Sequence, residues 1–247
     1  VMCLWHRYGV RRISGIRYGY HGLLPGCTPP LSLAPAVVAD IHRRGGTILG
    51  SSRGGGDRVA EIVESAMAMR LNMLFTIGGD GTLRGARDIG IEARRRGYPL
   101  AVIGVPKTID NDLSYIEKSF GFDTAVSSAV QAVSSAHVEA RDVMNGIGIV
   151  KVMGRESGFI AAHTTLASGD VNFVLIPEIP FELHGTNGLL AHLRKRLEHR
   201  RHAVILVAEG AGQELMHAVD GTDASGNKKL GDIGIFLKTG IADFFKE

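Results

Sequence analysis

Short apolar runs alternate with longer amphipathic segments from about residue 57 to the end of the chain. Apolar residues at the 3.6-residue period of a helix predict an amphipathic helix that Asp57 caps, with a buried face of Val59, Ile62, Val63, Ala66 and Met67. A longer helix is predicted after a cap at Asp123 or Thr124, with a buried stripe of Val126, Ala129, Val130, Val133, His137 and Ala140.

Between these amphipathic segments, mainly apolar runs predict buried strands at 73–77, 100–105, 147–152, 171–176 and 203–208. Each run ends in a turn rich in glycine or polar residues, a pattern typical of parallel βα units. Two more short strands are predicted at 12–18 and 47–49, with an irregular proline-rich loop at 25–35 between them. The pattern therefore predicts an α/β fold with a parallel sheet, whose five strand-end loops converge on one ligand-binding crevice.

Composition agrees with a soluble globular enzyme. The chain has 247 residues, of which 45% are hydrophobic and 33 are glycines, which suits a protein with many tight strand-to-helix turns. The longest apolar run is too short to cross a bilayer, so no membrane segment is predicted. The two cysteines, Cys3 and Cys27, lack metal-ligand spacing, which favours a reducing compartment and a cytoplasmic location.

Basic residues cluster at 94–96 and 194–202, although the net charge is only +3. No aromatic residues are interleaved for base stacking, so these clusters are interpreted as solvated helix faces and not as a nucleic-acid site. His199 and His202 are spaced for one helix face, but no third ligand lies nearby in the sequence. No zinc site is predicted there.

The loop after the first predicted strand is suited to holding phosphate, since residues 78–82 read GGDGT. Its glycines let backbone N–H groups approach phosphate oxygens, the following helix presents its positive N-terminus, and Asp80 offers a hard oxygen for Mg²⁺. An ordinary glycine-rich turn is the alternative reading. The motif also occurs in kinases of NAD and of lipids.

The next strand-end loop, residues 106–112, reads PKTIDND and contains two carboxylates two residues apart. Asp110 and Asp112, with Lys107 and Thr108 beside them, suit acid–base chemistry next to a phosphate group. This loop argues against the other kinases that share GGDGT. Phosphoryl transfer is therefore the predicted reaction class.

In order and spacing, five motifs resemble the phosphofructokinase family: GGDGT at 78, PKTIDND at 106, GFDTA at 121, MGRESGF at 153 and AEG at 208. Together with GSSR at 50 and NGIGIVK at 145, they are similar to its plant and protist ATP-dependent branch. The resemblance spans nearly the whole chain. It implies transfer of the γ-phosphoryl group of MgATP to the 1-hydroxyl of fructose 6-phosphate, a step of glycolysis.

The resemblance also implies an architecture. The expected fold is Rossmann-like, with an ATP-binding lobe at 1–125, a fructose 6-phosphate lobe at 126–247 and the active site between them. A homo-oligomer, either a dimer or a tetramer, is expected, with no nucleic-acid or membrane partner.

Residue roles follow from the resemblance, position by position. Asp110 is expected to take the proton of the sugar hydroxyl, with Asp112, Thr108 and Arg155 as further catalytic residues. ATP is expected to contact Arg53, Gly79, Asp80, Gly81 and Thr82, and Asp80 to hold Mg²⁺. Fructose 6-phosphate is expected to contact Lys107, Thr108, Asp110, Met153, Gly154, Arg155 and Glu209. The plainer readings are a helix-start salt bridge for Arg155 and a solvated loop carboxylate for Glu209.

Gly81 and Lys107 bear on the phosphoryl donor in opposite directions. Family members that use pyrophosphate carry Asp in place of Gly81, where a carboxylate would repel the α-phosphate of ATP. Lys107 is shared with those pyrophosphate enzymes, whereas the shorter bacterial ATP enzymes have glycine. The plant and protist branch combines both residues of this chain, so ATP is favoured and pyrophosphate is the alternative.

The chain also departs from the family pattern. No glycine-loop strand precedes Trp5, and the residues that complete the second lobe do not follow Glu247. Gly146 stands where bacterial members have a cross-subunit arginine, as it does in the plant and protist branch. A truncated and at best weakly active chain is therefore expected, and a non-catalytic phosphofructokinase-like protein is a second reading.

Overall fold

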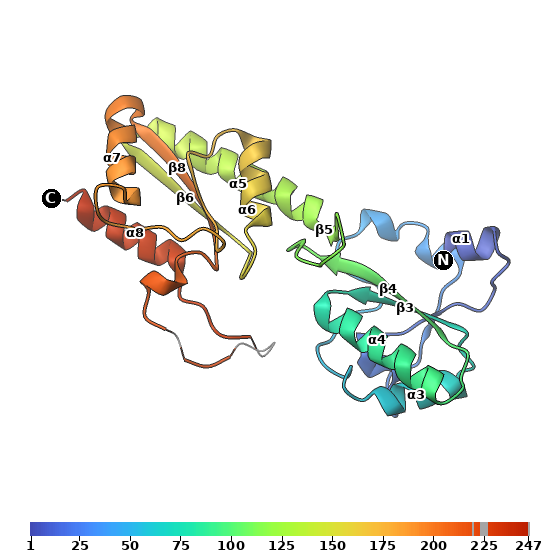
Figure 1. The fold of residues 1–247 in the computed structure, drawn as a ribbon. Helices are drawn as coiled ribbons and strands as arrows, with labels where there is room; N and C mark the ends of the chain where they lie inside the picture. The colour runs from blue at the N-terminus through green and yellow to red at the C-terminus, as the bar shows by residue number, and fades with distance from the viewer. Residues whose placement is uncertain (219, 223–226, 247) are drawn as a thin grey trace. The chain divides into compact units, whose positions relative to one another are not determined.

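The computed structural model describes residues 1–218, 220–222 and 227–246, and these group into two compact units (Figure 1). The first unit comprises residues 1–106 and the second residues 107–247, and each is described here by itself. The sequence placed the lobe boundary near 125. The observed division lies earlier, between Pro106 and Lys107, inside a strand.

The first unit packs two long helices against the first parallel strand pair. Its elements are α1 (Met2–His6), β1 (Ser14–Gly15), η1 (Gly19–Leu23), β2 (Leu31–Ser32), α2 (Pro35–Val38), η2 (Ile41–Arg43), α3 (Val59–Ala68), β3 (Met73–Gly78), α4 (Asp80–Arg95) and the start of β4 (Ala101–Thr108). Strand β3 runs parallel to β4, with Met73 opposite Ala101. The core of the unit consists of Leu23, Leu24, Ile62, Val63, Leu74, Ile89 and Ala93.

The second unit is built around a parallel sheet in the order β6-β8-β7. Its elements are β5 (Phe120–Gly121), α5 (Phe122–Asp142), β6 (Gly146–Val152), α6 (Phe159–Ser168), β7 (Phe173–Leu175), α7 (Leu189–Arg200), β8 (His202–Ala208), η3 (Gln213–Leu215) and α8 (Ile233–Phe244). Strand β5 pairs in parallel with the end of β4, with Lys107 opposite Phe120.

Strand β8 is the centre of the second unit because both of its faces are buried. Ala203, Ile205 and Val207 pack in one cluster with leucines of α7 and apolar residues of α8. Val204, Leu206 and Ala208 pack in another cluster with residues of α5 and α6. Figure 1 shows these two helix pairs on opposite sides of β6 and β8. A strand covered on both sides has no polar face, which explains the unbroken apolar run in the sequence.

The α/β class and the parallel sheets are confirmed, and each of the five predicted strands is present with shifted ends. Of the two additional strand predictions, the one at 12–18 is confirmed only in part and the one at 47–49 was wrong. Only Ser14–Gly15 of the first segment is a strand, and it pairs antiparallel with Leu31–Ser32, inside the predicted irregular loop. Residues 47–49 form no strand.

The predicted helix caps were also wrong. Helix α3 has Arg58 as its N-cap, and no side chain caps it, so Asp57 lies one residue too early. Helix α5 begins directly after β5, and its N-cap is Gly121, with φ of 111°. The left-handed backbone at this junction favours glycine, so neither Asp123 nor Thr124 occupies the cap position.

None of the helices in the described ranges combines the length and the hydropathy that a bilayer-spanning helix needs.

The buried face of α7 allows a test of the second unit. Leu193 is 0% exposed in the cluster between α7 and β8. Leu193→Ala should lower the free energy of unfolding by about 2–5 kcal/mol, because it removes buried methyl groups and leaves a cavity. Urea unfolding measures this effect, with Leu166→Ala as the control, since Leu166 is 82% exposed on α6. Equal losses in the two variants would contradict the assigned core.

Candidate active site

The glycine-rich turn between β3 and α4 is shaped by close packing. Gly78 ends the strand, Gly79 is the N-cap of α4, and Asp80 starts the helix. A Cβ atom on Gly78 would lie 2.3 Å from the Thr82 hydroxyl oxygen, so only glycine fits there without displacement. The turn therefore delivers backbone N–H groups and the positive end of a 16-residue helix to one place.

Asp80 and Gly81 leave the surface of this turn open. The Asp80 side chain is 69% exposed and lies 3.4 Å from the Arg84 guanidinium, one helical turn further on. No atom lies within 4 Å of the position that a Cβ on Gly81 would occupy. Asp80 and Gly81, two of the residues predicted to contact ATP, therefore leave room for a ligand above the first turn of α4.

Tyr20 of η1 supports the first turn of α4 from the other side. Its phenol donates a hydrogen bond of 2.6 Å to the Thr82 carbonyl oxygen. Its ring fits against Gly85 so closely that a Cβ there would lie 2.8 Å from a ring carbon, and against Gly56 at 3.3 Å. Burial raises the pKa of the Tyr20 phenol, which stays a neutral donor.

The same short helix holds the loop that carries Arg53. The Nε2 atom of His21 lies 3.0 Å from the Arg53 carbonyl oxygen, and the Ser52 hydroxyl donates to the Tyr18 carbonyl oxygen. Gly54 and Gly55 have φ of 82° and 80°, so this loop depends on glycine to turn. Arg53 and the GGDGT turn are therefore both supported by η1.

In the second unit, Thr108 and Asp110 form a local hydrogen-bonded turn at the end of β4. The Asp110 backbone N–H donates to the Thr108 hydroxyl at 3.2 Å, and that hydroxyl lies 3.3 Å from the Asp110 carboxylate. Asn111 follows with φ of 56°, and its side chain accepts from the N–H of buried Ser119 at 2.7 Å. Ser119 also donates to the Thr108 carbonyl at 2.8 Å. These contacts fix the backbone that carries Asp110.

Asp110 is the titratable group whose environment is most distinctive in this loop. Burial raises the pKa of its carboxyl, the negative charge of Asp112 raises the pKa further, and the hydrogen bond from Thr108 lowers it. Asp112 itself is exposed. A half-buried carboxyl with a raised pKa is a better proton acceptor than a solvated one, provided that it is ionised at the working pH.

The loop after β6 turns tightly beside Asp110. Gly154 has φ of 131°, and a Cβ on it would lie 2.3 Å from the Ser157 carbonyl oxygen. The Ser157 hydroxyl donates to the Asp110 carbonyl oxygen at 3.3 Å. The Gly158 N–H donates to the Glu178 carboxylate at 2.7 Å, which fixes the start of α6. The MGR loop and the PKTIDND loop are therefore in direct contact.

The loop after β8 joins the same group. The N–H of Glu209 donates to the Val152 carbonyl at 2.9 Å, and the N–H of Gly210 donates to the Gly154 carbonyl at 2.9 Å. A Cβ on Gly210 would lie 1.7 Å from the Arg155 carbonyl oxygen. The Arg155 guanidinium donates to the Lys228 carbonyl oxygen. Met153, in the loop after β6, is exposed.

The predicted residues thus fall into two sets. Thr108, Asp110, Asp112, Met153, Gly154, Arg155 and Glu209 lie on three strand-end loops of residues 107–247, and hydrogen bonds join these loops. Arg53, Gly79, Asp80, Gly81 and Thr82 lie in residues 1–106. Lys107 is exposed on β4, opposite Phe120. The expected convergence of all five loops on one crevice stays a prediction.

Four supporting residues were missed by sequence reasoning: Tyr20, Ser119, Ser157 and Glu178. Each bonds a main-chain atom far away in the sequence or fixes a turn, and a motif pattern carries no signal of such contacts. Among the described residues, no cluster of three or more His, Cys, Asp or Glu side chains could hold a metal ion.

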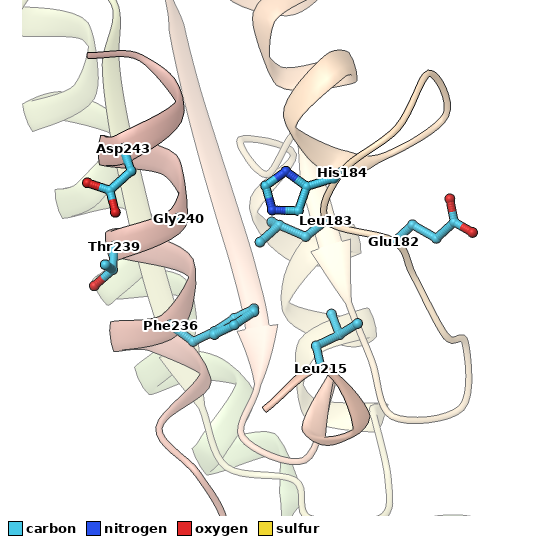
Figure 2. A pocket seen from close by; sticks show the side chains of 8 residues that line it. All are labelled: Glu182, Leu183, His184, Leu215, Phe236, Thr239, Gly240 and Asp243. Carbon is cyan, nitrogen blue, oxygen red and sulfur yellow. The ribbon is translucent and has the colours of Figure 1, made fainter. Parts of the chain in front are cut away.

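A hollow of about 780 Å³ lies away from these loops, between α8, residues 182–184 and η3. Figure 2 shows Leu183, Leu215 and Phe236 pointing into it, whereas the Glu182 side chain extends outward. None of the predicted site residues lines this hollow. It is not the site that the motifs predict.

Comparison with known proteins gives consistent matches. The model of the family described as Phosphofructokinase matches residues 1–242. The chain is 54% identical over 254 residues to the ATP-dependent 6-phosphofructokinase of Borreliella burgdorferi, covering 100% of this chain and 57% of that protein. It is 53% identical to ATP-dependent 6-phosphofructokinase 7 of Arabidopsis thaliana, covering 100% of this chain and 51% of that one. The chain spans about half the length of the curated relatives it matches.

Solved structures agree on the fold. A pyrophosphate-dependent phosphofructokinase from Marinobacter aquaeolei matches with a TM-score of 0.75 at 23% identity, over 98% of this chain and 59% of that chain. Pichia pastoris phosphofructokinase in the T-state matches with a TM-score of 0.76 at 23% identity, over 96% of this chain and 25% of that chain. At this identity the likeness concerns the fold alone.

Tyr20 gives a test of how the glycine-rich turn is supported. Tyr20→Phe should lower the free energy of unfolding of the first unit by about 1 kcal/mol, because the Thr82 carbonyl loses its donor. Hydrogen exchange across 78–85 should rise together with this loss. Tyr115→Phe is the matched control, since Tyr115 is fully exposed. If the two variants behaved alike, Tyr20 would not support the turn.

Proposed function

We propose, starting from the fact that the chain belongs to the phosphofructokinase family, that it carries the reaction machinery of an ATP-dependent 6-phosphofructokinase. The reaction would transfer the γ-phosphoryl group of ATP to the 1-hydroxyl of fructose 6-phosphate and yield fructose 1,6-bisphosphate and ADP. The observation that carries the proposal is the half-buried Asp110 carboxyl, which lies 3.3 Å from the Thr108 hydroxyl. The loop of Asp110 is also hydrogen-bonded to Ser157, which belongs to the loop after β6. A sugar hydroxyl that attacks phosphorus needs a base in a fixed position to accept its proton, and Asp110 lies beside two further strand-end loops.

In the proposed step, Asp110 accepts the hydroxyl proton while the sugar oxygen forms its bond to the γ-phosphorus. The bond between the γ-phosphorus and the oxygen that bridges it to the β-phosphate breaks, and its electron pair leaves with ADP. A neutral sugar hydroxyl is a poor nucleophile, so proton acceptance by a positioned carboxylate assists the attack. The raised pKa of Asp110 makes its ionised form the stronger base.

The nucleotide is proposed to bind at the GGDGT turn and Arg53. Backbone N–H groups of residues 79–82 and the N-terminus of α4 would contact its phosphates, with the Arg53 cation nearby. A single exposed carboxylate, Asp80, fits a magnesium ion that keeps several waters and is shared with nucleotide phosphates. When bound, Mg²⁺ neutralises charge on the phosphates. Asp80 would then exchange its contact with Arg84 for that ion.

On the sugar side, fructose 6-phosphate is proposed to contact Lys107, Met153, Gly154, Arg155 and Glu209, with Arg155 also acting on the transferring group. The hydrogen bonds that join the loops after β6 and β8 support this grouping. The carboxylate of Glu209 would accept from sugar hydroxyls, and the guanidinium of Arg155 would pair with phosphate oxygens.

ATP is proposed as the donor in preference to pyrophosphate. The space at Gly81 supports ATP, because a larger nucleotide needs room above the first turn of α4. The names of relatives at about 50% identity support it too. The pyrophosphate-dependent neighbour, at 23% identity, bears on the fold only. A cytoplasmic homo-oligomer, a dimer or a tetramer, completes the proposal.

Gly81 provides the test of the donor, in the complete natural protein that carries these residues. Gly81→Asp should lower kcat/KM for ATP by ~10-fold or more with little change in the KM for fructose 6-phosphate, since a carboxylate repels nucleotide phosphates. Coupled assays with ATP and with pyrophosphate measure both donors. Gly81→Ala is the uncharged control, and it should lower kcat/KM for ATP less than Gly81→Asp does, because it adds bulk without charge. Efficient turnover of pyrophosphate with negligible use of ATP would overturn the donor, and no turnover with either would favour a non-catalytic protein.

The pH profile tests Asp110 as the base. A base must be ionised, so kcat/KM should fall as the pH drops through its raised pKa. Asp112→Asn removes a negative charge that raises this pKa and should move the acidic limb to lower pH. Thr108→Val removes the hydrogen bond that lowers it and should move the limb to higher pH.

Asp110→Ser is the companion variant, and it should lower kcat by ~10²–10⁴-fold at saturating substrate. An acidic limb that stayed at the same pH in Asp112→Asn, together with near-normal kcat in Asp110→Ser, would exclude Asp110 as the base.

A further inference from the structure

Gln213, the first residue of η3, uses its whole side-chain amide on main-chain atoms. Its Nε2 atom donates to the Glu209 carbonyl oxygen at 2.8 Å and to the Gly231 carbonyl oxygen at 3.2 Å. Its Oε1 atom accepts from the Gly231 N–H at 2.9 Å. The side chain therefore makes two hydrogen bonds to the main chain of Gly231, one as donor and one as acceptor, and a third to the main chain of Glu209.

The turn that delivers Gln213 is itself fixed. Gly212 has φ of 63°, and a Cβ on it would lie 2.9 Å from the Phe181 ring and 3.0 Å from Ile233. These neighbours belong to the core below α8. Gln213 thus projects from a packed turn and not from a loose loop.

The two segments that Gln213 joins carry the proposed sugar contacts. Glu209 lies at the end of β8, where its N–H bonds to Val152 of β6. On the other side, Gly231 follows Lys228 by three residues, and the Lys228 carbonyl oxygen accepts from the Arg155 guanidinium. The side-chain amide of Gln213 therefore links the main chain of Glu209 to residues 228–231, the segment that binds Arg155.

The Gly231 segment is also anchored to the sheet. Asp232 is the N-cap of α8, where its carboxylate accepts from the Gly234 and Ile235 N–H groups. That carboxylate also lies 2.9 Å from the Lys151 ammonium on β6, and this hydrogen-bonded pair lowers the pKa of Asp232. The segment is therefore anchored to the sheet through Asp232 as well as to Gln213 through Gly231.

We propose that Gln213 is a positioning residue that sets the affinity for fructose 6-phosphate. It does so by fixing the position of Glu209 relative to residues 228–231, the segment that binds Arg155. The inference rests on the proposed function, because the sugar roles of Arg155 and Glu209 belong to it. Among the described residues, the side-chain hydrogen bonds of Gln213 go to Glu209 and Gly231, so the proposal has it act through Glu209 and Arg155. Nucleotide affinity, which the proposal assigns to residues 53 and 79–82, should not depend on it.

The chemistry of the contact supplies a selective variant. Both the Glu209 and the Gly231 carbonyls need a donor, and glutamine provides it through Nε2. Gln213→Glu keeps the size of the side chain but turns an oxygen toward these two carbonyls. Their negative ends raise the pKa of the new carboxyl, and its protonated form regains a donor. The defect should therefore be largest well above that pKa and shrink as the pH falls toward it.

The experiment compares wild type, Gln213→Glu and the control Gln131→Glu in the complete natural protein. Gln131 is exposed on α5, so it receives the same charge change without the contact. At about pH 8, Gln213→Glu should raise the KM for fructose 6-phosphate by ~10-fold and the KM for MgATP by less than about 2-fold. The ratio of variant to wild-type KM for the sugar should fall toward 1 as the pH is lowered to about 6. Gln131→Glu should match wild type throughout.

Other outcomes would overturn the inference in distinguishable ways. An unchanged KM for fructose 6-phosphate in Gln213→Glu would refute the positioning role while leaving the proposed function intact. Equal rises in both KM values, or a lower Tm with no dependence of the KM ratio on pH, would assign Gln213 a merely structural role. A wild-type protein that neither turns over fructose 6-phosphate nor binds it in calorimetry would refute the proposed function, and the inference would fall with it.

Discussion

The close crossing of two strand-end loops, after β6 and after β8, is the constraint on which the second unit's site depends. Gly210 lies so near the Arg155 carbonyl oxygen that a Cβ would stand 1.7 Å from it, and its N–H bonds to Gly154. Position 154 in turn requires glycine for two reasons: its backbone is left-handed, with φ of 131°, and a Cβ there would lie 2.3 Å from the Ser157 carbonyl oxygen. This crossing sets where Ser157 reaches Asp110. Two glycines that carry no functional group therefore help to set the position of the proposed base, together with the turn that Thr108, Asn111 and Ser119 build.

The sequence predicted strands best where the whole segment is apolar and buried. The run at 203–208 was predicted as a buried strand, and in the structure both of its faces pack against helices. Strands β1, β2 and β5 are two residues long, and their pairing is set by tertiary contacts that no local pattern encodes. The cap of α5 failed for a related reason: Gly121 belongs to β5 and to the helix start at once, which leaves Asp123 inside the first turn.

The candidate site was predictable to the extent that its residues carry their own chemistry. Asp80 and Asp110 stand in motifs whose residue types point to phosphate and proton transfer, whereas the role of Arg155 was implied only by the resemblance to the family. Tyr20 does not, because its role is a bond to a carbonyl 62 residues further along the chain. Ser157 likewise bonds a carbonyl 47 residues away. A side chain that serves a main-chain atom can be recognised only when the fold has brought the two together.

The raised pKa of Asp110 also depends on contacts that form only in the folded chain. Its neighbour Asp112 is exposed, so solvent and salt screen the repulsion between the two carboxylates. Burial is the larger cause of the raised pKa, and burial comes from the turn that Thr108, Asn111 and Ser119 build. The Thr108 hydrogen bond opposes it and favours the ionised form. Burial and the charge of Asp112 therefore raise the pKa of this carboxyl, and the Thr108 hydroxyl opposes them by favouring the ionised form.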